Sequence, residues 1–243
     1  MPTNGKLVSR LPRYNDGMRI LVTAGNTQVL IDRVRCITNI FTGRTGASIA
    51  LEAYRRGHHV TLVTSHPEVI DALDPDPGRW RCIPYRTFDD LDGLLGQHVA
   101  GHDAVVHCAA VADYLPAGVF SASQVGDALT MHDRSAPKVK SDEPELWLRL
   151  LRAPKLVDKI RSDWKFRGIL VKFKLEVGVT EDALRTIAEK SRQHSGADCI
   201  VANTLEGASD WAIIGTAKGD CKVARGDLPA ALLDWLELGE TRG

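Results

Sequence analysis

The residues best suited to chemistry lie in a polar loop between an apolar run and a glycine-containing turn. Arg35 and Asn39 stand in this loop. A guanidinium binds carboxylate or phosphate through two hydrogen bonds, and an amide can orient a polarised carbonyl. Gly25 and Gly43 allow close backbone approach to a ligand, and Gly43 precedes an expected helix whose N-terminus attracts anions. The loop is predicted to bind an anionic ligand, although Asp32 could instead hold Arg35 in a structural ion pair.

Polar residues also follow later apolar runs. Asp113 could hold a ribose hydroxyl, a metal or an amine, or cap a helix. Lys138 and Lys140 point the same way on an extended chain and could fold over a polyphosphate, or form a solvated turn. Lys174 follows Phe173, which could stack on a base or pack in the core. Ligands of open α/β sheets bind where the strands end, so this edge is the predicted site.

The elements that position these residues follow from the apolar pattern. Short apolar runs predict buried parallel strands at 20–23, 60–64, 104–108, 169–173 and 199–202. Helices are predicted over 46–56, 180–194 and 228–238, and a terminal hairpin within 209–224. This alternation predicts an α/β fold with a doubly wound, mostly parallel Rossmann-like sheet and a small C-terminal β extension.

One domain is expected. Residues 1–17 are predicted to form a flexible N-terminal arm, and residues 18–243 a single domain. Residues 114–143, rich in Ala, Ser, Gly and Pro and without clear periodicity, predict a long irregular flap loop. Such loops inside compact domains are usually functional or disordered.

Composition excludes several classes of protein. Lys plus Arg and Asp plus Glu both number 31 in 243 residues, so no global basic field attracts nucleic acid. No stretch is long and apolar enough for a membrane span, and no secretion signal is expected at the N-terminus. Five scattered cysteines predict reduced thiols in the cytoplasm. The histidines lack metal-ligand spacing and there is no Gly-x-Ser-x-Gly motif, which argues against a zinc enzyme or a serine hydrolase.

Taken together, these segments resemble the phosphopantothenate–cysteine ligase family of coenzyme A biosynthesis. In the first half of the chain, the family motifs Val-Thr-x-Gly-x-Thr, Val-Arg-x-Ile-x-Asn, Ser-Ser-Gly-x-x-Gly and Ala-Ala-Val-Ala-Asp-Tyr correspond to 22–27, 34–39, 42–46 and 109–114. In the second half, Lys-x-Lys-Lys, Thr/Asn-Pro-x-Ile/Leu, Gly-Phe-Lys-Leu and Ala-Asp-x-x-x-Ala-Asn correspond to 138–141, 153–156, 172–175 and 197–203. They follow the same order from Arg19 onward, which makes the resemblance specific.

The resemblance implies a two-step ligation in a cytoplasmic homodimer. CTP or ATP, with Mg²⁺, activates 4′-phosphopantothenate as an acyl-nucleotidylate, which the amine of L-cysteine then attacks. It implies catalytic roles for Asn39, Lys138 and Arg35, and substrate binding by Arg35, Asn39, Lys138, Lys140 and Lys174. It implies nucleotide binding by Gly25, Thr27, Gly43, Ala109, Ala110, Asp113, Pro154, Lys155, Leu156, Val157 and Phe173. It implies no metal site made of protein side chains alone, no nucleic acid and no membrane.

Two other functions stay open. The chain departs from the family pattern at Asn26, Phe41-Thr42, Ser141 and Val177. A nucleotide- or flavin-binding module without turnover is therefore one alternative. The other is a short-chain reductase that binds NAD(P). None of the four tyrosines has a lysine four residues later, so the Tyr-x-x-x-Lys pair of that class is missing.

Overall fold

The structure is a computed structural model that describes residues 17–70, 75–125 and 128–238. Of the N-terminal arm expected over 1–17, all but Gly17 lies outside the described residues. The body is an eight-stranded sheet in the order β13-β12-β11-β10-β6-β1-β4-β5. Its strands are β1 (Arg19–Ala24), β4 (His59–Thr64), β5 (Trp80–Pro84), β6 (Ala104–His107), β10 (Ile169–Glu176), β11 (Cys199–Thr204), β12 (Trp211–Thr216) and β13 (Gly219–Ala224).

The six strands from β5 to β11 are parallel, and β12 and β13 add an antiparallel hairpin at one edge. This arrangement confirms the expected mostly parallel fold with a C-terminal β extension. The central strands are near-continuously apolar because helices cover both faces of the sheet.

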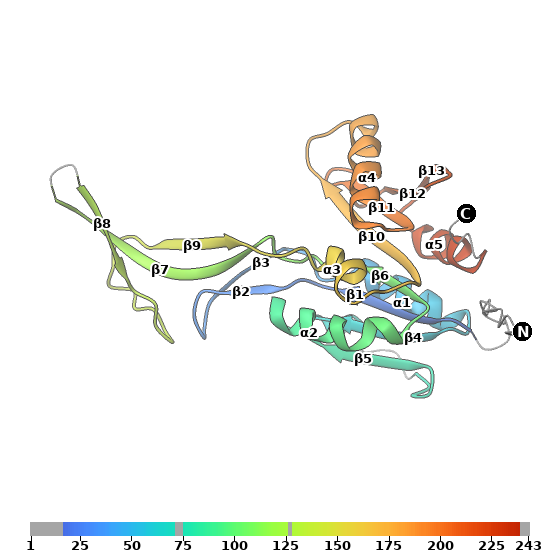
Figure 1. Cartoon of the computed structure of the whole chain (residues 1–243), viewed down its shortest axis with the longest axis horizontal. Coiled ribbons are helices and arrows are strands. Elements are labelled where there is room, and N and C mark those ends of the chain that lie inside the picture. The colour runs from blue at the N-terminus through green and yellow to red at the C-terminus, as the bar shows by residue number, and fades with distance from the viewer. Residues whose placement is uncertain (1–16, 71–74, 126–127, 239–243) are drawn as a thin grey trace, which may run out of the picture.

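The helices lie on opposite faces of the sheet (Figure 1). They are α1 (Arg44–Arg55), α2 (Phe88–His98), α3 (Leu156–Ser162), α4 (Glu181–Ser195) and α5 (Leu228–Glu237), with short 3-10 turns at Pro67–Ile70 and Val99–Gly101. Helices α1 and α5 pack on the face that carries Val22 and Val171, whereas α2 and α3 pack on the face that carries Leu21 and Leu170. Helix α4 covers Ile200 of β11.

Local signals explain the ends of the helices. The Thr180 hydroxyl accepts a hydrogen bond from the Ala183 N–H (3.3 Å), as expected of an N-cap, and Gly196 ends α4 with φ 61°. Helix α2 was not predicted, yet Thr87 and Asp90 form a reciprocal capping box at its start. The strand β5 and the short helix α3 were also missed from sequence.

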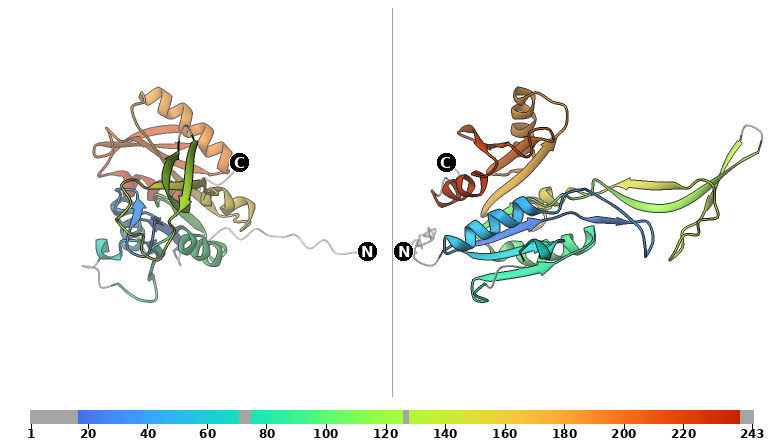
Figure 2. Two further views of the ribbon diagram at one scale, coloured as in Figure 1. Left: turned by 90° about the vertical axis from the view of Figure 1, so that its left-hand side faces the viewer. Right: turned by 180° about the vertical axis from the view of Figure 1, so that it is seen from behind.

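The expectation of an irregular loop over 114–143 is wrong for most of that segment. Residues Tyr114–Val125 (β7), Ala128–Asp133 (β8) and Trp147–Arg152 (β9) form a three-stranded antiparallel sheet in the order β8-β7-β9. Figures 1 and 2 show this sheet, here called the arm, extending from one side of the body. A smaller ribbon of β2 (Gln28–Leu30) and β3 (Cys36–Thr38) also leaves the body.

Local sequence conceals the arm because both of its faces include exposed residues, so the two-residue apolar alternation of a half-buried strand is lost. Pro116 and Gly118 lie where the pairing between β7 and β9 shifts register. No helix of the described residues is both long and apolar enough to cross a membrane.

Candidate functional site

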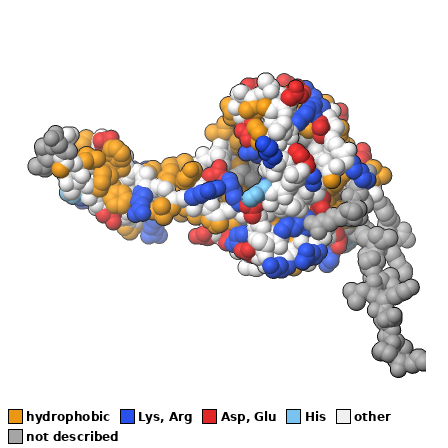
Figure 3. All heavy atoms as spheres, turned by 45° about the horizontal axis from the view of Figure 1, so that its top comes forward, with side chains coloured by type: hydrophobic (Ala, Val, Ile, Leu, Met, Phe, Trp, Pro, Cys, Tyr) orange, Lys and Arg blue, Asp and Glu red, His pale blue; other side chains and the backbone are white. Residues whose placement is uncertain are grey.

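A cavity of about 430 Å³ lies where β6 and β10 end, at the base of the arm. Figure 3 shows basic side chains and a histidine around a hollow in this region of the surface. Nine residues with a sequence-predicted role line the cavity: Ala109, Ala110, Asp113, Pro154, Lys155, Leu156, Val157, Phe173 and Lys174. The carboxyl ends of parallel strands meet at this edge, which brings segments 65 residues apart into one site.

The charges of the cavity are largely paired. Lys155 forms an ion pair with Asp113, and Lys174 contacts the Glu176 carboxylate at 2.8 Å. Asp113 does not cap a helix, because the strand β7 follows it directly. Both lysines keep partly exposed side chains, so each can exchange its carboxylate partner for an anionic ligand.

The loop after β1 is hydrogen-bonded to Ala110, which lines the cavity. The Ala110 N–H donates to the Gly25 carbonyl (2.8 Å), and the Ala110 carbonyl accepts from the Thr27 N–H (3.2 Å). The same carbonyl accepts from the Asn39 side-chain amide (3.2 Å). Asn39 therefore lies beside the cavity rather than on its lining.

Asn26, which stands where the family pattern commonly has Gly, shapes this loop. Its side-chain N–H₂ donates to the carbonyls of Asn39 (2.6 Å) and Phe41 (2.8 Å). One buried amide thus fixes the backbone at the candidate catalytic residue, Asn39, and two residues after it. The departure at position 26 has a structural reason.

The two predicted loop glycines touch each other. Gly43 has φ 79°, and a Cβ atom there would lie 2.2 Å from the Gly25 nitrogen. Gly25 has φ 85°, and a Cβ atom there would collide with the Ser65 hydroxyl. The pair is required for loop packing, and whether it also contacts a nucleotide remains a prediction.

Arg35, Lys138 and Lys140 belong to a second cluster, next to the turn between β2 and β3. Asp32 accepts from Arg35 Nη2 (2.6 Å) and from the Val139 N–H (3.1 Å), while Arg35 Nη2 also donates to the Val139 carbonyl (2.6 Å). The Arg35 guanidinium and neighbouring backbone N–H groups hold the pKa of Asp32 far below its usual value.

This geometry supports the structural ion pair between Asp32 and Arg35 that the sequence left open. It also places the exposed Lys138 and Lys140 on either side of the buried Val139, close to Arg35. None of these three basic residues lines the cavity. The predicted site residues thus form two groups, which the β1–β3 segment joins.

Sequence reasoning missed several residues that line the cavity: His107, Arg152, Lys172, Ser191 and His194. His107 and Lys172 are 7% and 8% exposed. Lys172 could have been found because it is a charged residue inside an otherwise apolar strand. His107 could have been found from its position, two residues before Ala109.

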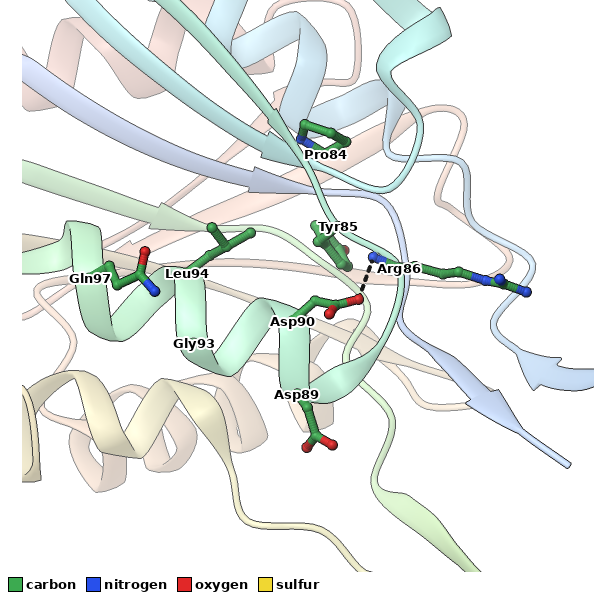
Figure 4. Close-up of a pocket in the computed structure, with 8 residues that line it drawn as sticks. All are labelled: Pro84, Tyr85, Arg86, Asp89, Asp90, Gly93, Leu94 and Gln97. Carbon is green, nitrogen blue, oxygen red and sulfur yellow. Dashed lines mark hydrogen bonds between the residues drawn. The ribbon is translucent and has the colours of Figure 1, made fainter. Parts of the chain in front are cut away.

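A second hollow, of about 590 Å³, lies between the end of β5 and α2 (Figure 4). Its polar groups serve the fold. Asp90 accepts from the N–H groups of Arg86 (3.1 Å) and Thr87 (2.8 Å) at the start of α2. Figure 4 shows the Arg86 side chain extending away from the helix, and its guanidinium donates to Gln28 (2.6 Å). This hollow is larger but holds none of the predicted site residues, so it is not the candidate site.

Comparison with known proteins assigns the family. Residues 15–225 match the family described as the DNA/pantothenate metabolism flavoprotein C-terminal domain. The chain belongs to this family. A crystal structure of the DNA/pantothenate metabolism flavoprotein from Streptococcus pneumoniae is 30% identical, with a TM-score of 0.78, and the alignment covers 92% of this chain and all of that one.

Curated relatives of this family member are longer proteins. The coenzyme A biosynthesis bifunctional protein CoaBC of Thermococcus kodakarensis is 32% identical over 197 residues, which are 80% of this chain and 43% of the relative. CoaBC of Escherichia coli is 27% identical over 188 residues, 77% of this chain and 41% of the relative. The aligned part of the chain thus spans less than half the length of these relatives.

Proposed function

We propose that the chain is a phosphopantothenate–cysteine ligase that uses CTP or ATP. The observation that carries the proposal is the cavity at the carboxyl edge of the sheet, with an amide, Asn39, tied to its rim. The family of the chain supports this reading, because its curated relatives are coenzyme A biosynthesis proteins.

The reaction has two steps. A carboxylate oxygen of 4′-phosphopantothenate attacks the α-phosphorus of the nucleotide, and pyrophosphate leaves. The amine of L-cysteine then attacks the acyl carbon, loses a proton and expels the nucleoside monophosphate. Neither step needs an enzyme nucleophile, so the protein contributes orientation and charge stabilisation.

Asn39 is assigned to the acyl carbonyl. One N–H of its amide is held by the Ala110 carbonyl, so the group is oriented before substrate binds. Its other N–H and its oxygen make no further hydrogen bond within the described residues and remain for the substrate. A preorganised donor of this kind stabilises negative charge that develops on the carbonyl oxygen.

The cavity is assigned to the nucleotide. Ala109 and Ala110 leave room for a ring or ribose, and Lys155 and Lys174 supply positive charge for phosphates. Mg²⁺ would be bound chiefly by the triphosphate, as is usual for this ion, with Asp113 as a carboxylate on the same cavity. Lys138, in the segment that connects β8 to β9, is assigned to the cysteine-dependent step.

A second copy of the chain is proposed to cover the arm. Apolar side chains are exposed along the arm and the β2–β3 ribbon: Val34, Ile37, Ile40, Phe41, Tyr114, Leu129, Met131, Trp147, Leu150 and Leu151. Figure 3 shows hydrophobic side chains gathered on the arm. A three-stranded sheet with exposed apolar faces gains stability from a partner, and self-complementary twofold contact is the commonest solution.

The dimer is tested by sedimentation of the full chain and of Trp147→Glu. The wild type is expected to sediment as a dimer and the variant to shift toward monomer, with the fold of the body retained by circular dichroism. A wild type that is monomeric at micromolar concentration would contradict the assignment. We also propose a cytoplasmic location, which the five scattered cysteines of the sequence favour.

The ligase is tested by pyrophosphate release. Protein, Mg²⁺ and CTP or ATP are mixed with 4′-phosphopantothenate, with and without L-cysteine. Release that requires 4′-phosphopantothenate supports the ligase. Nucleotide binding without turnover would favour the inactive module, and oxidation of NAD(P)H with a carbonyl substrate would favour the reductase.

A further inference from the structure

Two buried side chains on the floor of the cavity have no role in the proposal so far. His107 ends β6 and Lys172 lies in β10, and their Cα atoms are register partners in neighbouring parallel strands. Register partners point to the same face of a sheet, about 4.8 Å apart. Both are more than nine-tenths buried, and both line the cavity.

The hydrogen-bond network fixes which nitrogen of His107 carries the proton. The Thr23 hydroxyl accepts from the Ala109 N–H and lies 3.1 Å from His107 Nδ1. Thr23 is fully buried, and among the described residues its O–H has no acceptor except that nitrogen. Nδ1 therefore accepts, and Nε2 carries the hydrogen. Burial, with Lys172 nearby, lowers the pKa of His107 to about 4, so the ring is neutral at pH 7.

Lys172 adds further donors. Its Nζ donates to the Ser191 carbonyl at 3.1 Å. An ammonium has three N–H bonds, and the residues that the structure describes provide no acceptor for the other two. The other two lysines of the cavity have carboxylate partners, but no ion pair is formed by Lys172 within the same residues. The floor thus presents neighbouring donors from two strands and needs acceptors from a ligand.

We propose that His107 and Lys172 recognise the base of the nucleotide and select cytosine over adenine. Cytosine carries two adjacent acceptors, O2 and N3, on one edge, which match two neighbouring donors. Adenine places its amino group beside N1 and beside N7, so a donor would meet a donor. This inference rests on the proposed ligase function and names the nucleotide of that site as CTP.

Burial favours the base over a phosphate at this position. The pair lies on the floor of the cavity, where it borders the apolar core formed by Leu156 and Leu170. A triphosphate carries several charges and is better placed toward Lys155 and Lys174, whose side chains stay partly exposed. Lys172 also stands where the resembling family motif has Gly, so this contact is a feature of the present chain.

The test is direct calorimetric binding of CTP, ATP, GTP and inorganic tripolyphosphate to the full chain. The variants are Lys172→Met, which removes the donors at similar length, and Lys172→Arg, which keeps them. Lys190→Met on the exposed side of α4 is the matched control. The wild type should bind CTP more tightly than ATP. Loss of hydrogen bonds from a charged donor should weaken CTP binding about 10- to 100-fold in Lys172→Met. ATP and tripolyphosphate binding should change little, and Lys172→Arg should restore part of the CTP affinity.

Four other outcomes would overturn the proposal, and each rejects a different part of it. If Lys172→Met lost equal affinity for CTP and for tripolyphosphate, His107 and Lys172 would be assigned to a phosphate rather than to the base. Preference for ATP or GTP would reject cytosine. Unchanged CTP affinity in Lys172→Met, in a protein that still releases pyrophosphate, would remove this inference and leave the ligase in place. A folded wild type that binds no nucleotide would remove both.

Discussion

The neutral state of buried His107 predicts how the stability of the protein depends on pH. The pKa of a histidine is 6.5 in the unfolded chain, whereas burial lowers that of His107 to about 4. Between these values the unfolded state binds a proton that the folded state does not. Stability therefore falls as the pH drops from 6.5 to 4 and stops falling from this source below pH 4.

The size of the effect follows from the two pKa values. One pKa unit corresponds to about 1.4 kcal/mol, so His107 would cost roughly 3 kcal/mol below pH 4 and roughly 2 kcal/mol at pH 5. This free energy is not reduced for solvent screening, because the His107 ring is buried. A loss of 2 kcal/mol is a large share of the 5–15 kcal/mol typical of a folded protein.

The assay is urea unfolding at pH 7.5 and at pH 5.0, followed by tryptophan fluorescence at one fixed protein concentration. His107→Gln is neutral at both pH values and should be less stable than the wild type at pH 7.5, because packing and the Thr23 contact change. At pH 5.0 the difference in the free energy of unfolding between the wild type and His107→Gln should be about 2 kcal/mol smaller. Lys190→Met should follow the wild type. If this difference in the free energy of unfolding were the same at both pH values within about 0.5 kcal/mol, the assignment of a neutral buried ring would be refuted.

Three further variants test the loop and the arm. Lys138→Gln should leave pyrophosphate release intact but slow transfer to cysteine, and equal loss of both steps would reject its assigned role. Asn39→Asp should block or trap the acyl-nucleotidylate, because a negative charge would face the acyl phosphate, and wild-type turnover would contradict this. Gly43→Ala should destabilise the fold by more than about 1 kcal/mol, since φ is 79° and the new Cβ meets the backbone of Gly25. Gly93→Ala in α2 is its control and should be neutral or stabilising, because nothing lies within 4 Å of the new Cβ; thermal unfolding measures both.

The amino-acid sequence was sufficient for most of the body of the fold, although not for β5, α2 and α3. Runs such as 20–23 and 199–202 lie within observed strands because a strand covered on both faces is apolar along its whole length. Helix α4 was found from its period and from Thr180 and Gly196 at its ends. The missed helix α3 is short and owes its structure to packing rather than to a local signal. The missed helix α2 does carry a local signal, the capping box of Thr87 and Asp90.

Part of the site was also accessible from sequence. The motif at 109–113 and the segment at 154–157 were each assigned to the nucleotide, and both line one cavity. Their contact partners were not accessible in the same way. The pair of Asp32 and Arg35 was one of two alternatives open to the sequence, but the bond from Arg35 to the Val139 carbonyl joins residues more than 100 positions apart.

The sequence by itself therefore determined five of the six parallel strands and the motifs at their ends, because both depend on short stretches of neighbouring residues. The arm depends on pairing between β7, β8 and β9, which no local alternation marks. The neighbouring donors of His107 and Lys172 depend on the register between β6 and β10. Only the tertiary structure decided these features, since a strand register joins residues that are far apart in the chain and places their side chains on one face.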